Sequence, residues 1–297
     1  MGPIAATTMG MRTTTMVIMK GTTAMQAMLT STRLPAAAAT TMQGITATIM
    51  PAMMSTATST ITGITGTTTP TGMAEAGFLP LLCWLSPSFP VGAYAYSHGL
   101  EWAVEAGDVG DEAGLEAWLT DILHVGFGLN DAILLGAAYR AAAAGDSTCF
   151  REVNELALAL AGSAEFRLET AQQGRSFLDA VRAAWPHPSI EEVGPDIEEI
   201  ALPVALGLAA AAHGLDVRQT AQAYLTALAQ NLVSAAIRLA PIGQTSGQRI
   251  LARMLPGLAR LAEEALSLGV EDVGSSTFRA DLGSFRHETQ YTRLFRS

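Results

Sequence analysis

The five histidines are the side chains of this chain with the widest chemical use, and their spacing limits what they could do. No two of them stand four residues apart, so the sequence lacks the helical histidine pair of zinc proteases. His98 and Glu101 are three residues apart and would share one face of a helix. Imidazole and carboxylate groups both bind divalent transition metals, so this pair could contact such a metal transiently. The alternative, which we favour, is a buried hydrogen-bonded pair that holds the helix on the core.

Lysine is absent after Lys20, and its absence excludes two kinds of active site. A phosphate-binding P-loop needs a Gly-Lys-Ser/Thr sequence, which the GQTSG segment at 243–247 lacks, so we interpret this segment as a capped helix start. An enzyme that uses pyridoxal phosphate needs a lysine for its Schiff base. The order and spacing of serine, histidine and aspartate indicate no catalytic triad. We therefore predict that the chain is not an enzyme.

The chain divides near Met73 into two parts of different composition. Residues 1–73 contain 12 of the 13 methionines, no acidic residue and no helical or strand period, so we predict a disordered extension. A His/Asp-rich coding sequence read in a shifted frame would give the same composition, in which case the protein begins at Met73. A Met/Thr-rich metal-binding tail is the third interpretation.

Residues 74–297 carry 14 arginines against 27 acidic residues, a net charge of −13. Because nucleic-acid binding needs a basic face, we expect no nucleic-acid partner. Cys83 and Cys149 stand in apolar contexts, which predicts buried free thiols. We recognise neither a secretory signal nor a membrane-spanning run, and we expect no membrane partner.

Apolar residues recur at intervals of three and four through the second part, which predicts helix after helix. The expected helices cover 115–123 with Asp111 as N-cap, 133 to Gly145, 153 to Trp185, and 221–239 before Pro241, with a loop or short acidic turn at 186–200. The predicted fold class is therefore all-α, with one helical-bundle domain over 74–297 after the disordered extension at 1–73.

Four segments of the second part resemble the urease accessory protein family UreF. They are 86–107, with the motif core Pro90, Gly92, Tyr94, Tyr96, Ser97, His98, Gly99 and Glu101; the helix with Glu165, Arg167, Glu169, Gln172 and Arg175; 234–249; and 286–297. Each segment is moderately specific, and together they occur in the expected order over 78–297. Residues 1–73 do not resemble the family.

The resemblance implies a cytoplasmic, all-α homodimer without catalytic turnover that promotes nickel insertion into urease. Such a protein is a scaffold that bridges the accessory protein UreD, also called UreH, to the GTPase UreG, and the assembly docks on apo-urease. The resemblance implies no intrinsic cofactor, because the complex handles the nickel, with His98 and Glu101 as candidates for transient contact.

Two segments are candidates for partner binding. The polar residues of the 165–175 helix form either a solvated face or a partner surface. The last twelve residues carry arginine and aromatic side chains, which interface hot spots favour, namely Arg286, His287, Tyr291, Arg293, Phe295 and Arg296. We predict that this segment docks on UreD, so that its deletion abolishes UreD binding with little change in helical content or melting temperature; the alternative is that it folds back on its own acidic domain.

Two other functions would need different features. A stand-alone helical enzyme needs a convergent set of acid, base and nucleophile. A nickel-storing chaperone needs a dense cluster of histidine or cysteine in the domain.

Overall fold

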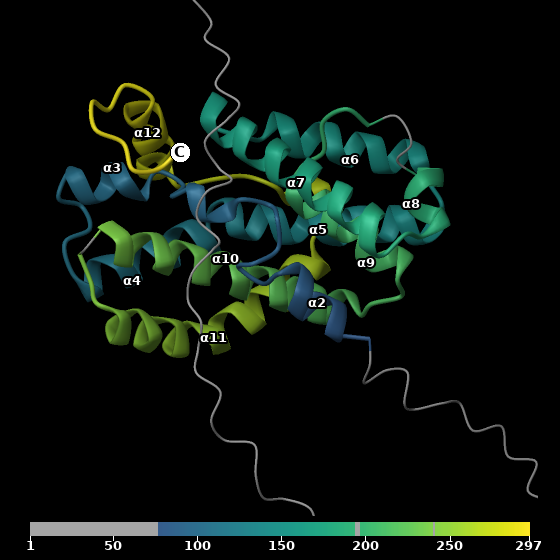
Figure 1. The fold of residues 1–297 in the computed structure, drawn as a ribbon, viewed down its shortest axis with the longest axis horizontal. Helices are drawn as coiled ribbons and strands as arrows, with labels where there is room; N and C mark the ends of the chain where they lie inside the picture. The colour runs from purple at the N-terminus through teal and green to yellow at the C-terminus, as the bar shows by residue number, and fades with distance from the viewer. Residues whose placement is uncertain (1–76, 194–196, 240) are drawn as a thin grey trace, which may run out of the picture. The chain divides into compact units, whose positions relative to one another are not determined.

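Helices and connecting loops make up the described chain, which in this computed structural model covers residues 77–193, 197–239 and 241–297 (Figure 1). The elements are α2 (Leu79–Trp84), η1 (Ala93–Ala95), α3 (Leu100–Glu105), α4 (Glu112–His124), α5 (Phe127–Ala144), α6 (Ser147–Ala159), α7 (Ala164–Ala184), α8 (Pro188–Val193), α9 (Leu202–Ala212), α10 (Val217–Leu239), α11 (Gln244–Ser267), η2 (Val270–Asp272) and α12 (Phe278–His287). No strand occurs in these ranges, so the predicted all-α fold is confirmed. The predicted extension at 1–73 lies outside the described residues.

Several helix ends follow local signals in the sequence. Asp111 caps α4, because its carboxylate accepts a hydrogen bond from Gly114 N at 2.8 Å. α5 ends at Gly145, whose φ of +69° is the left-handed conformation that glycine adopts without strain. α11 begins directly after Gly243, as predicted, although no side chain caps it.

The single long helix predicted from 153 to Trp185 is wrong, because the chain breaks between α6 and α7. Ser163 caps α7, and its Oγ accepts a hydrogen bond from Phe166 N at 3.1 Å. Apolar residues continue across the break because both helices bury a face in the same core, so their period did not reveal it. Residues 186–200, predicted as a loop or turn, contain the short helix α8.

α5 lies at the centre of the domain, where it packs against α4, α6, α9, α10 and α11 (Figure 1). Its approach to α9 is close: a Cβ on Gly207 would lie 2.6 Å from the carbonyl oxygen of Leu135. α7 approaches the segment before α9 just as closely, since a Cβ on Gly174 would lie 2.0 Å from Ile200 O. Glycines at these contacts let the backbones meet where any side chain would force them apart.

Two expectations about exposure have different outcomes. Among the described residues, one stretch, 112–144, is long and apolar enough to cross a membrane, but 67% of its apolar window is buried inside the domain and it bends between α4 and α5. We interpret it as core. The prediction that Cys83 and Cys149 are buried is wrong: both are exposed, because each lies on the outer face of its helix.

Candidate functional site

The segment that precedes α3 has an unusual backbone. His98 (φ +52°) and Gly99 (φ +73°) are consecutive left-handed residues that turn the chain from the extended Tyr96 into α3. A left-handed histidine is uncommon. A Cβ on Gly99 would lie 3.1 Å from Ala280 O and 3.3 Å from Ser284 N, so α12 packs directly on this backbone. The turn therefore brings the motif against the C-terminal helix.

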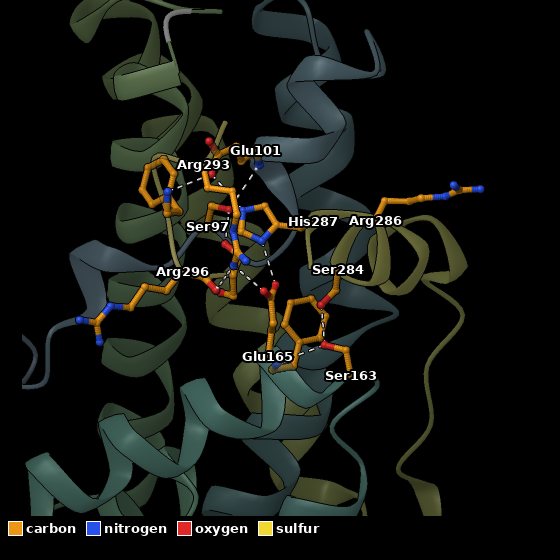
Figure 2. A network of polar contacts seen from close by, with 12 residues as sticks. Ser97, Glu101, Ser163, Glu165, Ser284, Arg286, His287, Arg293 and Arg296 are labelled. Atoms are coloured by element: carbon orange, nitrogen blue, oxygen red, sulfur yellow. Dashed lines mark hydrogen bonds and ion pairs between the residues drawn. The ribbon is translucent and has the colours of Figure 1, made fainter. Parts of the chain in front are cut away.

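Glu101, in the first turn of α3, binds the C-terminal segment 288–297 (Figure 2). Its Oε1 accepts a hydrogen bond from Leu294 N at 2.6 Å, and its Oε2 accepts one from Phe295 N at 2.9 Å. His287 Nε2 lies 3.0 Å from the same Oε2. Hydrogen bonds to a buried carboxylate are among the strongest in proteins, so Glu101 anchors the segment firmly.

His287 lies between two carboxylates and is fully buried. Its Nδ1 is 2.8 Å from Glu165 Oε2, on the opposite side of the ring from Glu101. Both contacts are hydrogen bonds when the ring carries both protons. Arg293 also pairs with Glu165 and donates to the carbonyl oxygen of Arg296 at 2.8 Å. These contacts tie α3, α7 and α12 together.

The last residue reaches the interior of the domain. Ser97 N and Ser97 Oγ donate to Ser297 O at 2.9 and 2.5 Å. Ser297 Oγ donates in turn to Glu169 Oε2 at 2.5 Å. Glu169 is 1% exposed, and its other oxygen accepts from Gln173 Nε2 and lies 2.9 Å from His98 Nε2. Burial by itself lowers the pKa of His98. The charge of Glu169 and its hydrogen bond to the ring outweigh burial, so the pKa of His98 is raised.

Phe295 provides the apolar anchor of the segment. It is 4% exposed, and the guanidinium of Arg238 lies 4.3 Å from the centre of its ring, a cation–π contact. Arg238 also donates to Tyr94 O at 2.5 Å. Burial lowers the pKa of Arg238. α10 therefore holds both the motif and the end of the chain.

A cavity of about 390 Å³, partly open to solvent, adjoins this network. Its polar wall includes His98, Glu169, Asp131 and Tyr224, whose hydroxyl donates to Asp131 Oδ2 at 2.6 Å. Burial raises the pKa of Asp131 to about 6, against the opposing effects of Tyr224 and His98. Burial and the nearby Asp131 raise the pKa of Tyr224 well above its ordinary value.

The interpretation of His98 and Glu101 as a pair on one helix face is wrong. His98 precedes the helix and bonds with Glu169, whereas Glu101 bonds with His287 and the C-terminal segment. Each is therefore a member of a buried pair, but with a different partner.

The structure divides the residues that we predicted to bind a partner into two sets. Glu169, His287 and Phe295 are buried and hold the C-terminal segment in place, as do the half-buried Glu165 and the Arg293 that pairs with it. Six side chains are exposed, namely Arg167, Gln172, Arg175, Arg286, Tyr291 and Arg296, although Gln172 and Arg296 also contact the hydroxyl of the buried Tyr96. Figure 2 shows Arg286 and Arg296 extending away from the network. The segment does fold back on its own domain, while its exposed side chains remain accessible.

Sequence reasoning missed Asp131, Tyr224 and the anchoring role of Ser297. Asp131 and Tyr224 stand on helices whose apolar period marks them only as core positions. Arg238 lies in a segment that resembled UreF, but nothing local points to its contact with Phe295.

The chemistry of this site is that of holding a peptide segment. The polar groups that hold the C-terminal segment are hydrogen-bonded to one another, and among the described residues no group of three or more His, Cys, Asp or Glu is arranged to hold a metal ion. These features define an all-α protein whose buried polar network holds its own C-terminal segment on the domain.

Comparison with known proteins gives the family. The family model for UreF matches residues 109–255. The chain is 64% identical over 225 residues to the urease accessory protein UreF of Xanthobacter autotrophicus strain Py2, which covers 75% of this chain and 93% of that protein. It is 58% identical over 230 residues to the UreF of Azorhizobium caulinodans, covering 76% and 99%. The chain therefore belongs to the UreF family of urease accessory proteins.

Proposed function

We propose that this protein is a non-catalytic scaffold of urease maturation that bridges UreD (UreH) to the GTPase UreG and promotes nickel insertion into apo-urease. On this proposal it acts in the cytoplasm, has no cofactor of its own and leaves the nickel to the complex. Membership of the UreF family supports a role in urease maturation. The finer assignment of partners rests on the resemblance of the four motifs and on the surface described next.

The observation that carries the proposal is the C-terminal surface. Tyr291 is fully exposed and Leu294 is 62% exposed, although the neighbouring Phe295 is buried. α12 adds the exposed Phe278 and Phe285. Large apolar side chains held on an ordered backbone lose little entropy when a partner covers them, so such a surface is suited to binding. Exposed arginines around it suit an acidic or polar rim on UreD.

The proposal can be tested by measuring the affinity of the full chain for purified UreD. We expect the double substitution Tyr291→Ala and Leu294→Ser to weaken binding by roughly thirtyfold, about 2 kcal/mol, because truncated hot-spot side chains cost this much. Leu255→Ser is a matched control, because Leu255 is 46% exposed on the distant α11. Unchanged affinity in the double variant, with the control also unchanged, would show that UreD does not dock here.

The homodimer is a separate part of the proposal. Phe78, directly before α2, and Leu79 and Leu82 on α2 are exposed, and a second copy could cover them. Light scattering at micromolar concentration should give twice the mass of the chain. A strict monomer would contradict the dimer and leave the UreD-binding proposal untouched.

A further inference from the structure

We propose that the partly open pocket beside Asp131 is a binding site for a small organic cation, one with an ammonium or amidinium head and an apolar body. The site goes beyond the accessory function, because it is formed by this chain alone.

Asp131 provides the place for the positive head. Among the described residues only the Tyr224 hydroxyl donates a hydrogen bond to it, at 2.6 Å. An ionised carboxylate has room for about four hydrogen bonds, so most of the accepting capacity of Asp131 is unused. Glu169, in the same wall, already receives hydrogen bonds from Gln173 and Ser297 and pairs with His98. Of these two carboxylates, Asp131 is therefore the one with accepting capacity left for a ligand.

The charge of the cavity wall also favours a cation. Its ionisable acids are Asp131, Glu169 and Asp281, and its bases are His98 and Arg238. Arg238 is committed to Phe295 and to the Tyr94 carbonyl. The wall is net negative even when His98 is protonated, so an anion would be repelled. Because the described residues hold no metal-ligand cluster, we assign an organic cation rather than a bare metal ion.

The rest of the wall fits an apolar body. Phe127, Phe166, Phe177 and Leu206 line it, and aromatic rings stabilise neighbouring cations as well as apolar groups. Trp84 also lines this wall, which adds a further aromatic ring to it.

The test uses the full chain at pH 7.5 with 2-phenylethylamine as the probe. Its neutral counterpart 2-phenylethanol and its acidic counterpart 3-phenylpropanoate have similar apolar bodies. Titration calorimetry should show the amine binding at least tenfold more tightly than the alcohol, and the acid more weakly than either. The amine should also shift the NMR resonance of the Trp84 indole N–H.

Asp131→Asn should remove the preference for the amine while leaving the affinity for the alcohol within about twofold. Asp121→Asn, on the exposed face of α4, is the matched control and should keep the preference. Equal affinity for the three probes, an amine preference that survives Asp131→Asn, or an unmoved Trp84 resonance would overturn the proposal.

A measurement on the unaltered chain guards against a variant that fails to fold. At pH 5 Asp131, with a pKa of about 6, is mostly protonated, while the amine stays charged. The groups that face Asp131 are His98, Tyr224 and Glu169. The amine preference should therefore fall at least fivefold between pH 7.5 and pH 5, and a preference that stays constant would also overturn the proposal.

Discussion

Replacement of Glu101 by glutamine should release the C-terminal segment from the domain. Glu101 Oε1 accepts from Leu294 N, whereas Oε2 accepts from Phe295 N and lies against His287 Nε2. A glutamine amide has one acceptor oxygen and one NH₂ group. In one orientation the NH₂ faces Leu294 N, and in the other it faces both Phe295 N and His287. Neither orientation satisfies all three donors.

The magnitude follows from these contacts. A hydrogen bond to a charged group contributes about 1.5–3 kcal/mol, and a buried donor left without a partner costs about 1–3 kcal/mol. We therefore expect Glu101→Gln to weaken the attachment of residues 288–297 by about 3 kcal/mol. Local opening can release the segment without unfolding the bundle, so this loss should appear first in the local exchange of its amides.

The assay is hydrogen exchange of the Leu294 and Phe295 amides, with urea unfolding followed by circular dichroism in parallel. A change of about 3 kcal/mol corresponds to roughly hundredfold faster exchange at these amides, with the core of α5 much less affected. Glu155→Gln removes the same charge from an exposed position on α6 and should leave both measurements unchanged within about 0.5 kcal/mol. If the two amides of the Glu101 variant exchange within threefold of the wild-type rate, Glu101 does not anchor the segment and the reasoning fails.

Three further predictions follow from the same structure. Gly99→Ala should lower the free energy of unfolding by about 1–3 kcal/mol, because φ is +73° and the added Cβ meets α12, whereas Gly110→Ala has open space around it and should be nearly neutral; equal urea midpoints would contradict this. Asp131 has a folded pKa of about 6, raised above its unfolded value, so it holds its proton more tightly when folded and its ionisation costs stability as pH rises from 4 to 6. The Asp131→Asn variant should therefore have a free energy of unfolding up to about 3 kcal/mol higher than wild type at pH 7, measured by urea unfolding, and this difference should vanish below pH 4. A difference that stays constant across that range would contradict the raised pKa of Asp131. Deletion of 286–297 should lower the melting temperature by several degrees, rather than leave it unchanged as the sequence alone led us to expect, because His287, Phe295 and Ser297 are buried; an unaltered scanning-calorimetry transition would restore the earlier expectation.

The sequence was sufficient for the class of fold and for much of its outline. The period of apolar residues predicted the bundle, and Asp111, Gly145 and Pro241 marked helix ends correctly. These features depend on residues within one or two turns of one another, and such local interactions are readable from the chain itself. The same locality explains the errors. The break at residues 160–163 was hidden, because both helices face the same core, and the exposure of Cys83 depends on which face of α2 the rest of the domain covers.

The contacts of the site were decided by the tertiary structure. Glu101 meets His287 across 186 positions of sequence, and Ser97 meets Ser297 across 200. A histidine and a glutamate three residues apart suggested a pair, but the left-handed backbone at His98 turned its ring toward Glu169 instead. Residue types therefore indicated that these side chains would be engaged. Their partners were set by helix packing, because hydrogen bonds form only where distant elements bring a donor within about 3 Å of an acceptor.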